Sequence, residues 1–196
     1  MVLASGGGTA GTPTVQRGNT GRNTTVPATP VQSSAPPPAP TTYKIGDTGP
    51  AGGIVFYDMG FSMNGWRYLE AASADIPGVW PWGAADSNVN GTTNGIGNGK
   101  RNTQIIVELL NQKGETMQAA QVADAYEQGE FGDWFLPSKD ELDLMYKNLK
   151  AKGLGGFQSG SYWTSSELSA SFSWYQKFSN GEQASESKNT AMYIRV

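Results

Sequence analysis

All 21 aromatic side chains of this 196-residue chain lie in residues 43–196, and none lies in residues 1–42. Large aromatic side chains supply much of the apolar area that a folded core buries. The first 42 residues instead consist mainly of Gly, Thr, Ser and Pro, and they hold seven of the eleven prolines. Such a segment cannot bury enough apolar surface to offset the entropy of ordering it. The sequence therefore predicts one globular domain over 43–196, preceded by a disordered linker or stalk over 1–42.

The chain contains no cysteine and no histidine. This excludes thiol and imidazole nucleophiles or bases, thiolate zinc sites and disulfides. The net charge is −3, and the only charges in residues 1–42 are Arg17 and Arg22, so residues 43–196 carry −5. A moderately acidic domain without a basic cluster argues against nucleic acid as a partner.

Two features of the sequence concern its location. No stretch approaches the ~18 apolar residues that a membrane-spanning helix needs, so we expect no transmembrane segment. The first residues, MVLASGGGTAG, lack the basic region and the apolar core of a secretory signal. This leaves a cytoplasmic protein or a mature form whose signal or lipid anchor has been removed. We expect the second, with the protein extracellular or at the cell surface.

Apolar patterning predicts an α+β domain with two to three helices and a small antiparallel sheet. Short apolar runs at 53–57 and 66–71 predict a β-hairpin. The segment 75–101 is too rich in Gly, Asn and Pro for regular structure, and long loops of this kind are often functional. Within it we expect Trp80 and Trp82 to anchor the loop to the core.

Three helices are expected after this loop. The first has Asn102 or Thr103 as its cap and an apolar stripe at helical spacing. The second covers about 116–127. The third is the best specified, because Ser138 and Glu141 form a capping box just before a periodic apolar run.

The last 35 residues, 162–196, combine bulky aromatic rings with short polar side chains. Large and small residues alternate over 172–178, Asn180-Gly181 is typical of a type I′ turn, and 192–196 forms a last strand. Aromatic rings give contact area at low entropy cost, and short polar side chains adapt to a partner. The mixture favours a presented contact surface over a catalytic pocket. The alternative is an ordinary antiparallel sheet with polar loops.

No other motif predicts a catalytic centre. Glu141 is accounted for by the capping box, and Asp140 by the favourable position of a negative charge in a helix first turn. The Gly-rich run that ends at Lys100 lacks the features of a phosphate-binding loop. Ser165 and Ser166 have no histidine to activate them. Calcium stays open, and its conceivable oxygen ligands are Asp47, Asp86, Asn88, Asn90 and Asp133.

Five blocks of sequence carry a resemblance to a known family. They are YKIGDTGPAGGIVFYD (43–58), GWRYLEAA (65–72), DWFLPSKDEL (133–142), YWTSSE (162–167) and the closing FSNG…YIRV. They resemble a family of bacterial surface domains, of the type found at the C-terminus of the Legionella collagen-like adhesin. The similarity covers roughly 43–196. It implies a C-type-lectin-like fold and a role in ligand binding and adhesion, without catalytic activity.

In some members of that family the domain is the target of a diversity-generating retroelement, which rewrites selected codons of the C-terminal segment at adenines. The matching stretches are often rich in Asn, and Ser, Ala, Phe and Tyr are all reachable from an Asn codon by changing adenines. The resemblance therefore implies a variable segment, about 162–196, on a fixed frame. The candidate variable, ligand-contacting residues are Leu168, Ser169, Ser171, Phe172, Tyr175, Glu182, Ala184, Ser185, Glu186, Ser187 and Met192. The frame aromatics are Trp163, Trp174 and Phe178.

The resemblance and the motifs together predict a non-enzymatic, surface-displayed binding protein without a cofactor. Its partner would be a protein or carbohydrate ligand on another cell or host surface, with Phe172, Trp174 and Tyr175 supplying most of the affinity. The alternative is a carbohydrate- or glycosaminoglycan-binding adhesin with an invariant, calcium-assisted site. The chain lacks the Glu-Pro-Asn, Gln-Pro-Asp and Trp-Asn-Asp signatures of calcium-dependent lectins, and its acidic domain disfavours polyanions. An enzyme of the formylglycine-generating branch of the same fold would need a cysteine, which is absent.

Overall fold

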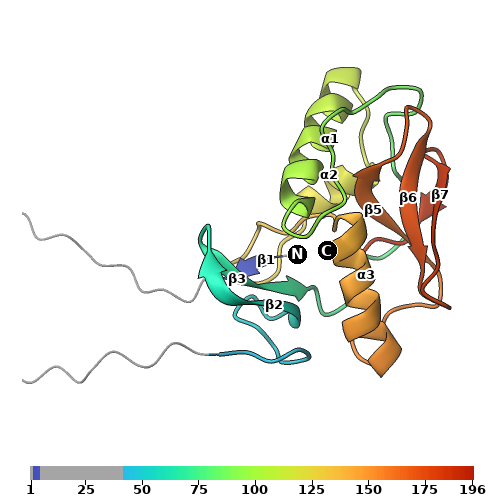
Figure 1. Cartoon of the computed structure of the whole chain (residues 1–196). Helices are drawn as coiled ribbons and strands as arrows, with labels where there is room; N and C mark the ends of the chain where they lie inside the picture. Colours follow the sequence, from blue (N-terminus) through green and yellow to red (C-terminus); the bar gives the residue numbers. More distant parts are fainter. Residues whose placement is uncertain (1, 5–41) are drawn as a thin grey trace, which may run out of the picture.

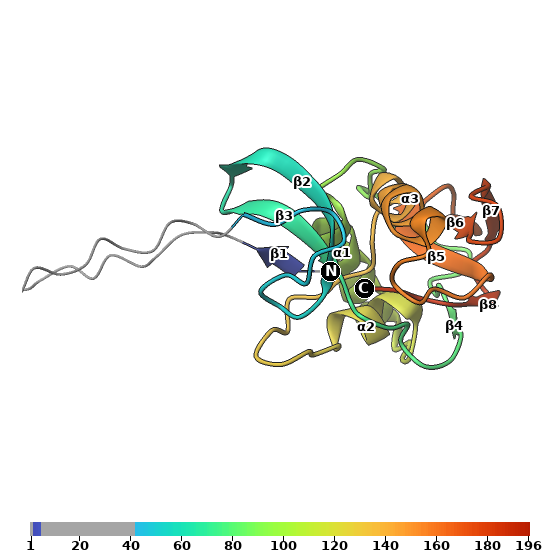
Figure 2. The same cartoon turned by 90° about the horizontal axis from the view of Figure 1, so that it is seen from below.

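The computed structural model describes residues 2–4 and 42–196. In these residues the chain is α+β, as predicted, with three α-helices and small antiparallel sheets. One three-stranded sheet lies at one end of the molecule and another at the opposite end, with α1 and α3 between them (Figure 1 and Figure 2). Apart from residues 2–4 and 42, the predicted linker lies outside the described residues.

The first sheet is built on the predicted hairpin. Its strands are β1 (Val2–Ala4), β2 (Ile54–Met63) and β3 (Trp66–Ala71), in the order β1-β3-β2. The antiparallel pairing of β2 with β3 confirms the hairpin, and β2 runs further than the predicted strand at 53–57. The strand β1 differs from the predicted disordered segment. It pairs antiparallel with β3, because the outer edge of β3 offers unpaired backbone N–H and C=O groups.

The C-terminal strands form two further sheets. Their bounds are β4 (Trp80–Pro81), β5 (Ser161–Glu167), β6 (Phe172–Lys177), β7 (Gln183–Ser187) and β8 (Ala191–Met192). β4 pairs with β8, and β5, β6 and β7 form the antiparallel sheet at the far end of the molecule (Figure 1). The predicted last strand is shorter than expected, because regular pairing stops after Met192.

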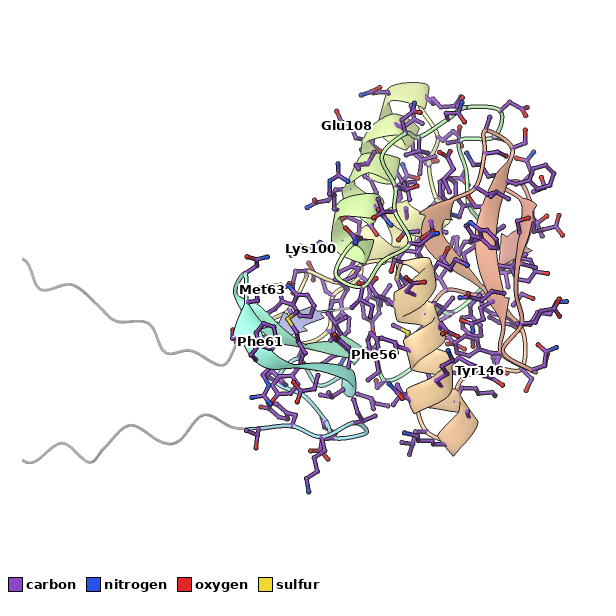
Figure 3. The ribbon with its side chains drawn as sticks, in the orientation of Figure 1. Phe56, Phe61, Met63, Lys100, Glu108 and Tyr146 are labelled. Atoms are coloured by element: carbon purple, nitrogen blue, oxygen red, sulfur yellow. The ribbon has the colours of Figure 1, made fainter. Side chains whose placement is uncertain are left out.

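The turn between β6 and β7 is not the predicted type I′ turn. Such a turn needs a positive φ at both central residues, and only Gly181 has one, at 81°. The N–H of Lys177 donates to the carbonyl of Glu182 at 2.8 Å, which closes a loop over 178–181. A Cβ at position 181 would also collide with the ring of Tyr146. Figure 3 shows Tyr146 on α3, on the side that faces this hairpin.

The helices are α1 (Gly99–Lys113), α2 (Ala119–Asp124) and α3 (Lys139–Asn148), followed by a short 3₁₀ turn, Lys150–Lys152. α1 begins before the predicted Asn102 or Thr103, and α2 is shorter than predicted. Asn102 and Thr103 are buried instead of capping the helix. The Asn102 amide donates to the carbonyl of Thr93 at 2.7 Å, and the Thr103 hydroxyl accepts from the N–H of Leu136 at 3.0 Å. These polar residues join the helix to the loops that pack against it.

The capping box of α3 is confirmed, and its carboxylate has a second role. The Ser138 hydroxyl accepts from the N–H of Glu141, and the Glu141 carboxylate accepts from the N–H of Ser138 at 2.6 Å. The same carboxylate accepts from the N–H of Gly97 at 2.7 Å. Burial raises the pKa of Glu141, although these hydrogen bonds oppose the shift. One acidic residue therefore joins the start of α3 to the end of the long loop.

The core contains most of the large aromatic residues. Trp82, Trp163 and Phe178 are fully buried, so the prediction that Trp82 anchors its loop is confirmed. The Trp82 indole N–H donates to the carbonyl of Thr164 at 2.8 Å, which fixes the loop to β5. Phe56 of β2 packs against the side of α3 that faces the first sheet (Figure 3). The expected frame residues Trp163 and Phe178 are therefore core residues, one in each of the two main apolar clusters.

Candidate functional site

The outer face of the β6–β7 hairpin is the candidate binding surface. Phe172 and Trp174 of β6 are paired with Ser187 and Ser185 of β7, so all four side chains lie on the same side of the sheet. The exposed turn that joins β5 to β6 adjoins this face at Phe172, because the N–H groups of Leu168 and Ser169 both donate to the Phe172 carbonyl at 3.0 Å. We call Leu168, Ser169, Phe172, Trp174, Ser185 and Ser187 the outer face. Leu168 is 50% exposed and Phe172 is 44% exposed.

The start of α3 borders the outer face. The Lys139 Nζ lies 4.2 Å from the centre of the Trp174 ring, a cation–π contact. The side-chain amide of Gln183 donates to the carbonyl of Lys139 at 2.9 Å. The Gln176 amide donates to Asp143 at 3.0 Å. These contacts hold α3 against the middle of the hairpin, so the exposed end of the outer face lies toward the turn between β5 and β6.

The structure brings some of the predicted site residues together and separates others. The candidates that share the outer face are Leu168, Ser169, Phe172, Ser185 and Ser187. Glu182 lies at the opposite end of the hairpin, paired with Lys177 at 2.9 Å. Ala184 and Glu186 alternate with the outer-face residues of β7 and therefore point to its other side.

Two predicted contact residues are buried. Tyr175 is 9% exposed and makes an edge-to-face contact with the Trp163 ring, with centroids 6.2 Å apart. Met192 is 8% exposed in the same core cluster. Their placement as exposed contacts is wrong, because Tyr175 is directly paired with Trp163 and shares its inward face. Conversely, Trp174 was expected in the frame and is only half-buried, on the outer face.

Sequence reasoning missed a buried ion pair behind the outer face. Lys188 is fully buried, and its Nζ lies 2.6 Å from the Glu167 carboxylate. The same ammonium donates to the carbonyls of Ser87 at 2.9 Å and Ala84 at 3.5 Å, and lies 4.7 Å from the centre of the Trp82 ring. Burial lowers the pKa of Lys188, and the Glu167 carboxylate opposes this shift. In the sequence, Lys188 is a single lysine directly after a polar strand, and this pattern does not predict a buried side chain.

The loop 83–92 contacts this ion pair and is strained. Ala84, Asp86 and Asn90 have φ values of 52°, 59° and 56°, a region that non-glycine residues rarely adopt. Each such residue costs about 1–3 kcal/mol and persists only when its surroundings hold it in place. The N–H of Ala84 donates to Glu115 at 2.9 Å, while its carbonyl accepts from Lys188. The loop is therefore held by contacts on both sides.

The conceivable calcium ligands do not converge. Asp47 accepts from the N–H of Lys44 at 2.8 Å, Asp86 accepts from the Ser171 hydroxyl at 2.9 Å, and Asp133 pairs with Lys100 at 3.2 Å. Within residues 2–4 and 42–196, no group of three or more acidic side chains is arranged to hold a metal ion.

Two hollows lie away from the outer face. One, of about 540 Å³, is lined mainly by apolar residues of α1, α2 and the segments beside them, including Val107, Val122 and Tyr126. The other, of about 500 Å³, lies at the β2–β3 hairpin and includes Phe61 and Met63. Figure 3 shows these two residues at the hairpin tip, across the molecule from β6 and β7. No predicted site residue lines either hollow.

No model of a known protein family matches this chain, and no curated protein matches its sequence. In the part of the chain that the structure describes, every helix is too short or too polar to cross a membrane.

Proposed function

We propose that this protein is a non-enzymatic, surface-displayed ligand-binding domain with a C-type-lectin-like scaffold, and that the outer face is its binding surface. The C-terminal coding segment would be diversified by a retroelement, which changes the five candidate variable residues of the outer face and leaves the frame, including Trp174, intact. One observation carries the proposal. Five candidate variable residues lie together on the outer face, while the aromatic residues Trp163, Tyr175 and Phe178 of the same segment are buried.

The composition of the outer face suits recognition. Leu168 and Phe172 are exposed apolar side chains, and an aromatic ring such as that of Phe172 can anchor a partner that covers it. Ser169, Ser185 and Ser187 surround them with short hydroxyl side chains that adapt to different partners. The partner we propose is a protein or a carbohydrate on another cell surface.

The arrangement of the frame supports the proposal that outer-face positions tolerate substitution. Residues on the outer face alternate along β6 with buried ones such as Ser173 and Tyr175. A change at Phe172 alters the exposed surface but leaves the packing of Trp163 against Tyr175 in place. Tyr175 and Met192 are therefore assigned to the frame, and the proposed contact set excludes them.

The adhesin alternative has one observation in its favour. Exposed aromatic rings beside serine hydroxyls are also suited to stacking against a sugar ring. A bound calcium ion would raise the melting temperature of the protein by mass action. Thermal melts with and without millimolar calcium separate the two functions, since the proposed diversified surface needs no metal and predicts no shift.

The diversification proposal is tested in the genome that encodes the protein. We expect a reverse-transcriptase gene nearby and a near-copy of the coding segment for residues 162–196 that differs from it at adenine positions. The differing codons should include those of Leu168, Ser169, Phe172, Ser185 and Ser187 and exclude those of the frame residues Trp163, Trp174 and Phe178. A neighbourhood without such a repeat rules out diversification for this protein.

The binding surface is tested with two libraries on the same scaffold. One randomises Leu168 and Phe172 on the outer face, and the matched control randomises Phe61 and Met63, which are similarly exposed, at the distant hairpin tip. Both are displayed on yeast and sorted against one labelled, purified protein as bait. We expect folded binders from the outer-face library at a frequency at least tenfold above the control. Equal frequencies from the two libraries would refute the outer face as a specialised surface.

A further inference from the structure

The ammonium group of Lys188 occupies a site whose shape matches its chemistry. A lysine ammonium has three N–H donors and no acceptor. Three oxygens surround it: the Glu167 carboxylate at 2.6 Å and the carbonyls of Ser87 and Ala84 at 2.9 Å and 3.5 Å. The ring of Trp82 faces the cation at 4.7 Å from its centre. The fully buried charge therefore has a partner for each N–H, one of them an anion.

The oxygens of this cage come from two segments that are far apart in sequence. Ala84 and Ser87 belong to the strained loop 83–92, and Glu167 ends β5, directly before the outer-face turn. The same Glu167 oxygen that contacts Lys188 also accepts from the N–H of Val89 at 2.8 Å. The ammonium and the carboxylate thus join the loop to the base of the turn.

The backbone of Lys188 joins the same segments. Its N–H donates to the carbonyl of Ser171 at 3.0 Å, and its carbonyl accepts from the N–H of Trp82 at 2.9 Å. The Ser171 hydroxyl in turn donates to Asp86 of the loop at 2.9 Å. The turn between β5 and β6 is consequently held at both ends, at Glu167 and at Ser171, while Leu168 and Ser169 between them remain exposed.

We propose that Lys188 is the positioning residue of the outer face, and that its ammonium fills an internal ammonium-binding cage which locks the loop 83–92 against the turn 167–171. The role of Lys188 in binding rests on the proposed function, whereas the cage itself does not. The cage fixes the backbone of the turn from behind. Side chains at the front can then be exchanged without moving the backbone that presents them.

The charge and not only the bulk of Lys188 carries this role. Removing the ammonium leaves the nearly buried Glu167 carboxylate without its counter-ion, and leaves the carbonyl of Ser87 without the ammonium as its donor. A neutral side chain of similar length fills the space but restores neither contact. An ammonium group supplied from solution restores both, if it can enter the space that a truncated side chain leaves.

The test compares Lys188→Ala, Lys188→Met and the control Lys113→Met. Lys113 is an exposed lysine that donates to the Ser87 hydroxyl of the same loop at 2.8 Å. Hydrogen exchange of the Val89 and Trp82 amides reports on the cage and needs no ligand. We expect both Lys188 variants to exchange at least tenfold faster at these amides, and Lys113→Met to match the wild type. Millimolar n-propylammonium should restore protection in Lys188→Ala but not in Lys188→Met.

Wild-type protection in Lys188→Met would overturn the proposal, because bulk alone would then suffice. Failure of n-propylammonium to slow exchange in Lys188→Ala would also overturn the ammonium site. If Lys188→Ala does not fold, Glu167→Gln takes its place. Glutamine keeps an acceptor for Val89 and removes the charge, so we expect faster exchange at Trp82, and unchanged exchange there refutes the cage.

Affinity measurements distinguish the proposed binding function of the outer face from the proposed cage around Lys188. Outer-face binders from the display library should lose at least tenfold in affinity for their bait when they carry Lys188→Met, and retain it with Lys113→Met. Unchanged affinity despite faster exchange would refute Lys188 as a positioning residue while the cage stands. If the library yields no binders but the exchange results are as expected, the proposed function fails and the cage survives.

Discussion

The two faces of the β6–β7 hairpin are built by alternate residues of the same strands, yet their surroundings differ. On the outer face, Phe172 is exposed and Ser187, its pairing partner, is partly exposed. On the inner face, Tyr175 packs on Trp163 and Lys188 is enclosed by the loop 83–92. The comparison shows that side-chain period separates exposed from buried residues over 172–175, and that it stops doing so at Gln176, which is on the side of Phe172 but is buried against α3. A variable segment can therefore contain fixed positions at every second residue.

The largest expected effect compares Tyr175→Ala with Phe172→Ala. Removing a large aromatic side chain from a core costs about 3–5 kcal/mol, and Tyr175 should lie at the lower end because a small part of its ring is exposed. Exposed substitutions usually change stability by no more than about 0.5 kcal/mol, so Phe172→Ala should be almost neutral. Urea unfolding of both variants measures the difference. Similar losses in the two variants would mean that the faces are not distinct.

A smaller effect concerns the pH dependence of stability at Glu141, which is opposite in sign to that at Glu182 on the exposed end of the hairpin. Burial raises the pKa of Glu141, so its folded state retains a proton that the unfolded chain releases. Its contribution to the free energy of unfolding is greatest below pH 4.5 and decreases as the pH rises through its folded pKa. Glu141→Gln should remove this decrease. Denaturant unfolding between pH 4 and pH 7 measures the slope, and an unchanged slope contradicts the prediction.

The smallest effect concerns Glu182 on the exposed end of the hairpin. Its hydrogen bond with Lys177 lowers the pKa of Glu182, so the stabilisation is present above pH 4.5 and is lost as the pH falls through its folded pKa. Because the pair is exposed, salt should screen the effect. Glu182→Gln should flatten the acid limb of the stability profile slightly in low salt and leave it unchanged in high salt. A steeper acid limb would contradict this sign.

Local patterns in the sequence predicted much of the fold. The β2–β3 hairpin, the capping box at Ser138 and Glu141, and the anchoring of Trp82 depend on neighbours in sequence or on strong burial tendency, and the structure confirms them. The predicted start of α1 at Asn102 or Thr103 and the predicted type I′ turn at Asn180 were wrong. In both, distant contacts override the local preference: Asn102 bonds to Thr93 within the fold, and the loop over 178–181 closes against Tyr146.

The sequence by itself determined the α+β class and the alternation of side chains over 172–175. Only the tertiary structure decided which half of that alternation faces the core, because the pairing of Tyr175 with Trp163 joins segments that pattern alone cannot orient. It also decided the role of Lys188. A lysine in a polar strand end is normally solvated, and only the fold brings the carbonyls of Ala84 and Ser87 around its ammonium.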